Sequence, residues 1–461
     1  MQLNGEHLIS LVITLILFLL PSLLAARKIG GAEDYSLGNR ASGAPIVSGA
    51  IVGTIIGGAA TLGTSQLAFC VGLSAWWFTL GSGIGLLILA LFYAYPLRQT
   101  GLSTIPQFLV AHFGKTAGPI TSLASSAGIF FSIIASMLSC FGLISAILGV
   151  SSLAAAFVTV GLVCLYVFWG GIRGAAWSGL CKTGLLYLTL VVAGTTALTS
   201  LGGINGLQTA FSSDPWLSLL GQGVGLAFSN AGSLIIGIIS TQTYAQAIFA
   251  ARDPHTAMVG SITAATLTIP IGLPSVLVGL FMRANHPDIL PLHALPLYLL
   301  NYLPAWLGGI ALAALLLSAI GSIAGLALGI GSMLSGDILR ELCGLHNNRL
   351  QLWANRGSIL FVCLFAAHFV LHNLDSLVLD WNFLSMALRG TGIFIPLTLA
   401  ILCPGKLRPA IAVCSMLAGL LASLAWLLLY PGYGNPLLPG LAGSLIVVLT
   451  GFLLTPASII D

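Results

Sequence analysis

Charged residues are scarce in this sequence of 461 residues. Asp, Glu, Lys and Arg make up only 6% of it, whereas soluble domains carry about 25%. Hydrophobic residues supply 57%, which excludes both a water-soluble enzyme and a disordered chain. The formal net charge of +4 is small and dispersed, so the sequence predicts no nucleic-acid partner.

Sequence signatures of catalysis are also missing. No glycine-rich loop ending in a lysine is present to bind phosphates. The apolar runs contain no nucleophile–base pair and no metal-binding triad, and the eight cysteines form no close pair. We therefore expect no enzymatic activity, no metal and no bound cofactor. Any uphill work would have to draw on an ion gradient or a partner.

Long apolar runs dominate what is present. A bilayer core takes about 20 apolar residues per helix, and the runs are too long for strands and lack the alternation of a barrel. They begin near Leu8, Ile46, Trp76, Ile120, Leu153, Ala175, Trp216, Met258, Ala305, Ser358, Leu377, Pro409 and Pro439. The sequence predicts an all-α membrane protein with about 13 transmembrane helices.

The distribution of Lys and Arg predicts the orientation. Arg27 and Lys28 follow the first apolar run, whereas a signal peptide would place its cations before it. If the N-terminus lies outside, nearly all cations fall in cytosolic loops and the outer loops keep only Arg283. We expect a multi-pass protein of the inner (plasma) membrane with a cytosolic C-terminus. Two cations, Lys182 and Arg389, remain inside apolar runs.

Glycines interrupt two of the runs. Gly57 and Gly58 stand in mid-run, where each weakens a helix by about 1 kcal/mol relative to alanine. They predict either an unwound segment lining a cavity or close helix packing. The seventh run contains Gly221, Gly223 and Gly225 and then residues 229–233, Ser-Asn-Ala-Gly-Ser. Interrupted helices five spans apart suggest two five-helix repeats, the second inverted.

Several segments resemble the sodium/solute symporter family in order and spacing, over about residues 7–456. They are Glu33-Asp34-Tyr35-Ser36-Leu37-Gly38-Asn39-Arg40, residues 104–114, residues 242–253, residues 303–309 and Gly336-Asp337-Ile338. The resemblance implies a leucine-transporter-like fold. Residues 1–43 would form the first helix and a cytosolic loop, 44–200 the first repeat, 201–404 the second, inverted repeat, and 405–461 two C-terminal helices.

The same resemblance implies a sodium site between the broken second helix and the ninth. Backbone oxygens of Gly53, Ile56 and Ala314 would bind the ion together with two successive hydroxyl side chains. Here those two positions are Leu317 and Ser318, and a leucine offers no side-chain oxygen to a hard cation. One ligand of the expected shell is therefore missing.

The sixth helix departs from the family in the same region. Family members often have Trp-Thr-Asp there, followed three residues later by Gln, whereas this chain has Trp177-Ser178-Gly179 and then Lys182. Some proton-coupled transporters of this fold place a lysine in the ion site. A buried ammonium can replace Na+ electrostatically and can exchange a proton. The alternative is that Lys182 snorkels to the cytosolic interface, about 10 Å away.

Arg389 lies too deep in its run to snorkel, and all the acids lie in tails, loops or run ends. It is predicted either to bind a substrate carboxylate or phosphate, or to act as a gate arginine bound to carbonyls or to Asp380. The substrate site predicted from the resemblance and from these arguments consists of Gly57, Gly58, Gln242 and Arg389.

The sequence thus predicts a secondary active, symporter-like transporter that imports a small, carboxylate-bearing organic solute by alternating access. Its sodium site would be degenerate, with Na+ or H+ as the coupling ion and proton coupling through Lys182. The alternatives are a sodium-coupled symporter of a neutral solute and a transporter-like sensor with a separate signalling partner. The expected partners are a small-molecule substrate and the lipid bilayer.

Overall fold

The computed structural model describes residues 3–25, 37–335, 339, 344, 347–430 and 435–453. Within these residues the backbone is helical apart from connecting segments and one isolated β-bridge between Ser42 and Ala251. The predicted all-helical fold is confirmed. Half of the first family-like segment, residues 33–36, and the segment 336–338 lie outside the described residues.

The helices follow the apolar runs, because a helix satisfies its own backbone groups where water is absent. They are α1 (Gly5–Ala25), α3 (Ala44–Ile55), α4 (Thr64–Val71), α5 (Trp77–Ile88), α6 (Ala94–Gln99), α7 (Ile105–Phe113), α8 (Ala117–Leu148), α9 (Ser152–Ser200), α10 (Gly203–Ala210), α11 (Val224–Ile239), α12 (Gln242–Phe249), α13 (Pro254–Asn285), α14 (Ala294–Asn301), α15 (Ala305–Met333), α16 (Asn348–Leu371), α17 (Val378–Leu402), α18 (Pro409–Leu429) and α19 (Leu437–Leu453).

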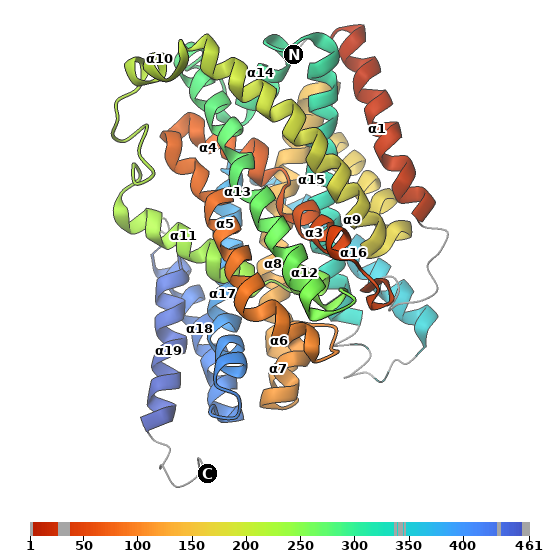
Figure 1. The fold of residues 1–461 in the computed structure, drawn as a ribbon, viewed down its shortest axis with the longest axis vertical. Coiled ribbons are helices and arrows are strands. Elements are labelled where there is room, and N and C mark those ends of the chain that lie inside the picture. The colour runs from red at the N-terminus through yellow and green to blue at the C-terminus, as the bar shows by residue number, and fades with distance from the viewer. Residues whose placement is uncertain are drawn as a thin grey trace.

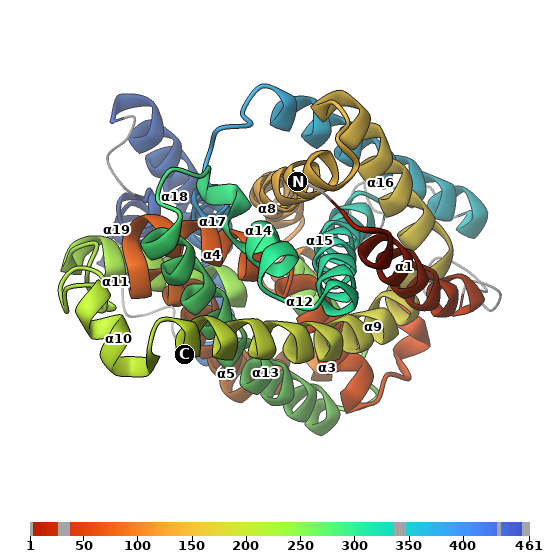
Figure 2. The same ribbon diagram turned by 90° about the horizontal axis from the view of Figure 1, so that it is seen from above.

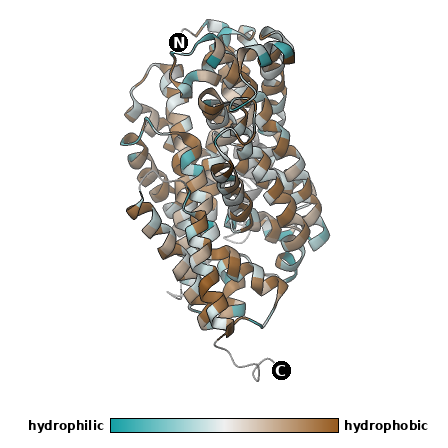
Figure 3. Ribbon diagram, turned by 90° about the vertical axis from the view of Figure 1, so that its left-hand side faces the viewer, coloured by the Kyte–Doolittle hydropathy of each residue, from teal (hydrophilic) through white to brown (hydrophobic). Residues whose placement is uncertain are grey.

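In the described part of the chain, nine helical segments are long and apolar enough to cross a membrane, and four shorter apolar helices join them. Hydrophobic residues run along most of the helix lengths (Figure 3). The helix α1 begins at one end of the molecule and α19 ends at the other (Figure 1).

The elements do not correspond one to one with the predicted runs. The single element α9 covers both runs predicted from Leu153 and Ala175. The run predicted from Trp216 becomes helical only at Val224, because Gly221 and Gly223 form a turn that a helix cannot include, Gly223 having φ 92°.

Two helices occupy the centre of the structure. In α15 every residue from Ala311 to Met333 is buried, and α8 is largely buried as well. Seen from above, α8, α12 and α15 lie inside, whereas α1, α16, α18 and α19 lie at the periphery (Figure 2). A charged side chain that packs against the middle of α15 is therefore shielded from solvent.

The second predicted run is interrupted where its glycines occur. The helix α3 ends at Ile55, residues 56–58 are not helical, and a π-helical turn at Ala59–Gly63 leads into α4. A Cβ on Gly57 would lie 2.0 Å from the Ser322 hydroxyl, and one on Gly58 would lie 2.5 Å from the Ser139 Cβ. Both predicted roles are therefore present, since the segment is unwound and also packs closely against α15 and α8.

The second interruption lies elsewhere than predicted. Residues 229–233 are a continuous part of α11, and the helix breaks at Ser240 and Thr241 instead. Thr241 is extended (φ −92°, ψ 118°), and its hydroxyl donates to Gly237 O at 2.5 Å. Glycines alone were a poor guide here, because short hydroxyl side chains can also satisfy the carbonyls of a terminating helix.

Similar helix packing occurs in the first half of the chain, residues 44–200, and in the second half, residues 201–404. The helix α9 packs extensively on α3 and α15, and α17 packs in the same way on α11 and α8. Each half thus places its last long helix against its own broken helix and against a central helix of the other half.

Candidate functional site

The break after α3 exposes backbone carbonyls in the middle of the protein. The last carbonyls of a helix have no partner within it. Two of them accept hydrogen bonds from hydroxyls of α15, Ser318 Oγ to Ile56 O at 2.6 Å and Ser322 Oγ to Thr54 O at 2.6 Å. These two bonds join the end of α3 to α15.

A third carbonyl accepts a hydrogen bond from Lys182. The ammonium of this α9 residue donates to Gly53 O at 2.5 Å and to Ser318 O at 2.9 Å. The Lys182 side chain is fully buried, so it does not snorkel to the interface. It lies at the C-terminal end of α3, where the helix dipole favours a cation.

Two glycines permit the close packing around this ammonium. A Cβ on Gly179 would lie 2.2 Å from Gly49 O and 2.8 Å from Gly53 Cα, so α9 and α3 are in close contact there. A residue with a carboxylate side chain at this position would not fit this close contact. A Cβ on Gly321 of α15 would lie 2.7 Å from Lys182 Nζ.

The structure brings together four of the five residues predicted for the ion site or its remnant, Gly53, Ile56, Ser318 and Lys182. Ala314 is buried one turn earlier on α15, but the carbonyls that accept from Lys182 are those of Gly53 and Ser318. Two titratable groups lie beside the ammonium, the Cys140 thiol of α8 and the Tyr166 hydroxyl of α9.

A small cavity lies next to this site, close to the size needed for a single water molecule. The α3 break, α5, α8, α12, α15 and α17 supply its lining: Thr54, Ile55, Gly57, Ala59, Phe78, Ser132, Ser136, Tyr244, Ser322, Leu326, Asn382 and Met386. Of the predicted substrate residues only Gly57 is among them.

Arg389 is fully buried beside the cavity and is engaged by protein oxygens. Its Nη2 donates to Ser132 Oγ at 2.8 Å and to Ser385 Oγ at 2.7 Å, its Nη1 to Thr241 Oγ1 at 2.8 Å, and its Nε to Ser385 O at 3.1 Å. One of these contacts is to a carbonyl, as the predicted alternative of a gate arginine expected, and the other three are to hydroxyls. Ser132 connects Arg389 to the cavity, because it contacts both.

Gln242, the remaining predicted substrate residue, is bonded to the backbone of a neighbouring segment. Its Oε1 accepts from Ile105 N at 2.8 Å and its Nε2 lies 3.5 Å from Ser103 O, so it joins α12 to the start of α7. The side chain is fully buried in that contact and does not line the cavity. Its amide satisfies the backbone of a neighbouring helix start, which a sequence motif alone does not reveal.

Sequence reasoning missed Ser322 and the hydroxyl partners of Arg389. Ser322 follows the predicted Ser318 by four residues, a spacing that places both on one helix face and could have been noticed. Ser385 precedes Arg389 by four residues on the same helix, whereas Ser132 and Thr241 come from distant segments that no local pattern connects to Arg389.

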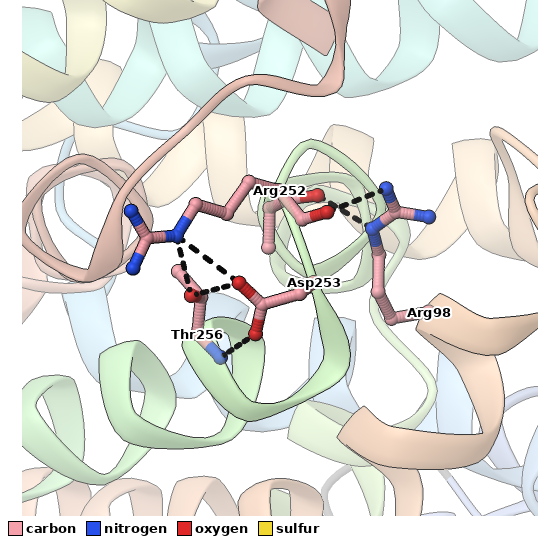
Figure 4. Close-up of polar contacts among 5 residues, drawn as sticks. Arg98, Arg252, Asp253 and Thr256 are labelled. Atoms are coloured by element: carbon pink, nitrogen blue, oxygen red, sulfur yellow. Dashed lines mark hydrogen bonds and ion pairs between the residues drawn. The ribbon is translucent and has the colours of Figure 1, made fainter.

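A polar cluster joins the predicted cytosolic ends of α6, α12 and α13 (Figure 4). Arg98 donates to the backbone carbonyls of Ala251 at 2.5 Å and Arg252 at 3.3 Å. Asp253 caps α13 by accepting from Thr256 N at 2.8 Å and Thr256 Oγ1 at 2.6 Å, and Arg252 contacts it at 3.1 Å. The bonds from Thr256, assisted by Arg252, lower the pKa of the Asp253 carboxyl to about 2.

Comparison with known proteins agrees with this architecture. The model of the Sodium:solute symporter family matches residues 35–419. A Na+-coupled sialic acid symporter of known structure superposes with a TM-score of 0.81 at 18% identity, covering 98% of this chain and 97% of that one. A nucleobase-cation-symport-1 family transporter in a closed conformation gives 0.55 at 11% identity, covering 90% and 92%. These likenesses show the leucine-transporter-like fold.

The sequence relatives are also named as transporters. A human high affinity choline transporter is 23% identical over 293 residues, which is 60% of this chain and 50% of that protein. An osmoregulated proline transporter of Bacillus subtilis is 29% identical over 208 residues, 43% of this chain and 42% of that protein. The matched part spans about half the length of these relatives or less.

Proposed function

Since this chain belongs to the sodium:solute symporter family, we propose that it is a secondary transporter in which the Lys182 ammonium takes the place of a coupling Na+. The family and the multi-pass helical fold make it a membrane transporter rather than an enzyme, and the family name implies Na+ as the usual coupling ion. The observation that carries our proposal is the pair of hydrogen bonds from Lys182 to Gly53 O and Ser318 O.

The chemistry of the site supports the substitution. Backbone carbonyls at the end of a half-helix are the usual ligands of Na+ in transporters with broken helices. An ammonium satisfies the same oxygens with hydrogen bonds and carries the same charge. Leu317 adds no oxygen, so a Na+ ion placed here would lack a ligand that the ammonium does not need.

The substitution changes what can couple transport to an ion gradient. A tethered lysine cannot leave the site as Na+ can, but it can release its proton. A neutral amine would hold Gly53 O and Ser318 O more weakly, because hydrogen bonds from charged donors are the stronger ones. Protonation would then hold α3 against α15, and proton release would free it. We therefore propose H+ as the coupling ion.

The charges around the cavity support a substrate with an anionic group. Lys182 and Arg389 are both fully buried, and the bonds described above join them to neutral oxygens only. Charges in a low-dielectric interior act strongly over such distances. A small carboxylate-bearing solute in the cavity, near Gly57 and Ser132, would offset them, whereas a cation would be repelled. The cavity would have to open to admit it.

The proposed orientation places the N-terminus outside and the C-terminus in the cytosol, across the plasma membrane. The opposite positions of the start of α1 and the end of α19 support it (Figure 1). Antibody access to a tag at either end of the protein in intact cells would test it, and an accessible C-terminal tag would contradict it.

Uptake into proteoliposomes tests the coupling. The reconstituted protein would be offered a panel of labelled carboxylates, amino acids and choline, with N-methyl-D-glucamine chloride replacing NaCl, and with or without an inward proton gradient. We expect uptake of a carboxylate that follows the proton gradient and does not need Na+. Lys182→Gln should abolish the response to the gradient while exchange of internal for external substrate continues. Uptake that requires Na+ and ignores the proton gradient would contradict the proposal.

A further inference from the structure

Arg389 holds a place in the second half of the chain that corresponds to the place of Lys182 in the first. Lys182 lies on α9, the last long helix of the first proposed repeat, and Arg389 lies on α17, the last helix of the second. Both side chains are fully buried cations near the centre of the protein.

The elements that each cation contacts also correspond. Lys182 joins α9 to the broken helix of its own half, through Gly53, and to α15 of the other half, through Ser318. Arg389 joins α17 to the broken helix of its own half, through Thr241, and to α8 of the other half, through Ser132. The helix α8 of the first half thus contacts Arg389 of the second half, and α15 of the second half contacts Lys182 of the first half.

Each cation also lies at the C-terminal end of a half-helix. Lys182 donates directly to a terminal carbonyl of α3. Arg389 donates to the Thr241 hydroxyl, which in turn donates to Gly237 O at the end of α11. The negative end of a helix dipole therefore faces a positive charge in both halves.

The surroundings of Arg389 are those of a cation site. Hydroxyl oxygens of Ser132, Thr241 and Ser385 and the carbonyl of Ser385 converge on its guanidinium. Gly128 leaves the space that the side chain occupies, because a Cβ there would lie 2.3 Å from Arg389 Cγ. Neutral oxygens of this kind are the ligands that hard cations prefer.

We propose that these oxygens form a second monovalent-cation site, the counterpart of the Lys182 site, and that Arg389 fills it as a tethered cation. Arginine keeps its proton under physiological conditions, unlike lysine. The second broken helix, α11–α12, is therefore held to α8 and α17 throughout transport. Arg389 is on this account a positioning residue and not a direct substrate ligand. The filling of this site does not depend on whether Lys182 couples transport to protons.

Thermal unfolding of the purified full-length protein tests the proposal without a substrate. Arg389→Ala would be melted in increasing methylguanidinium chloride, NaCl or choline chloride, beside the wild type. We expect the variant to melt at a lower temperature and to recover by a few degrees, saturably, with methylguanidinium or Na+ but not with choline. The wild type should show no saturable response to methylguanidinium.

A matched control is Arg283→Ala, which removes an arginine that lies over the rings of Phe69 and Trp216 instead of in an oxygen cage. This variant should not recover with methylguanidinium. If Arg389→Ala shows no saturable response to either small cation, or recovers equally with choline, the second cation site is refuted.

Two further variants cover the case in which Arg389→Ala does not fold. Arg389→Lys keeps a cation in the cage and should be purified folded, whereas Arg389→Gln should be less stable than Arg389→Lys. If Arg389→Gln is as stable as the wild type, no cation is needed there and the proposal fails. Loss of proton coupling in Lys182→Gln would leave all these outcomes unchanged, so the two proposals fail separately.

Discussion

The ammonium of Lys182 depends on space that neighbouring glycines leave. Gly321 faces Lys182 Nζ so closely that an added methyl group would lie 2.7 Å from it. The lysine end is flexible, so Gly321→Ala should displace it without unfolding the protein. Loss of a charge-assisted hydrogen bond is worth about 1.5–3 kcal/mol, so we expect proton-driven uptake to fall by about tenfold or more.

Gly184→Ala is the matched control for this substitution, since no heavy atom lies within 4 Å of its added methyl group. Gly184 is an exposed residue of the same helix as Lys182. The control should transport normally and gain up to about 1 kcal/mol of helix stability. Equal transport by both alanine variants would show that the Lys182 position is not set by Gly321.

Asp253 provides a control for the pH dependence of uptake that we assign to Lys182. Its carboxyl, held by Thr256 and Arg252, has a pKa of about 2 in the folded protein, below the usual value near 3.9. A lowered pKa adds stability that is complete above the unfolded value and is lost as the pH falls through the folded one. The contribution of Asp253 is therefore constant between pH 5 and pH 8.

We expect Asp253→Asn to melt at a lower temperature than the wild type by the same amount at pH 5 and at pH 8. Its pH profile of uptake should keep the wild-type shape, whereas that of Lys182→Gln should flatten. If Asp253→Asn flattens the profile instead, the titrating group lies at the cluster in Figure 4.

A residue of the site could be predicted from the sequence when its type is rare in an apolar run. Lys182 stood out because a cation interrupted an apolar run, and the structure places it beside Gly53 and Ser318 as the resemblance implied. The hydroxyls of Thr241 and Ser132 did not stand out, because serine and threonine are common in membrane helices and their meaning depends on a partner far along the chain.

At the scale of elements, two serine hydroxyls fasten the broken end of α3 to α15. Ser322→Ala would leave Thr54 O buried without its donor, at a cost of about 1–3 kcal/mol. We expect a lower melting temperature and a larger loss than for Ser275→Ala, since the buried Ser275 hydroxyl has no hydrogen-bond partner among the described residues. Equal losses in the two variants would mean that the Ser322 bond contributes little to the α3–α15 contact.

The helix breaks show what local sequence can and cannot predict. Gly57 and Gly58 predicted the first break correctly, because two adjacent glycines make the helical conformation less favourable. The glycines before Val224 marked a helix start instead, and the true second break at Ser240 and Thr241 carries no glycine. Its stability comes from side-chain bonds to helix-end carbonyls and from Arg389, which is 148 residues away from Thr241.

For the whole molecule, the apolar runs were sufficient to predict a multi-helical membrane protein. A segment that crosses the hydrocarbon core must satisfy its own backbone hydrogen bonds, and a helix does this within a single run. The division of the second half differed from the prediction, since loop residues 216–223 were included in a predicted run but fold as turns. The pairing of α9 with α15 and of α17 with α8 could not be predicted from hydrophobic periodicity, because α15 is buried on all sides and shows no single apolar face.

The central claim is that Lys182 occupies a site that would otherwise bind Na+. The most direct measurement is the melting temperature of purified protein in NaCl and in choline chloride at equal ionic strength. We compare the wild type, Lys182→Ala, and Lys182→Ala combined with Leu317→Ser, which restores the missing hydroxyl. The account predicts no response of the wild type to Na+, a saturable rise for Lys182→Ala, and a rise at lower Na+ concentration for the double variant. Saturable stabilisation of the wild type by Na+, with none gained by either variant, would contradict it.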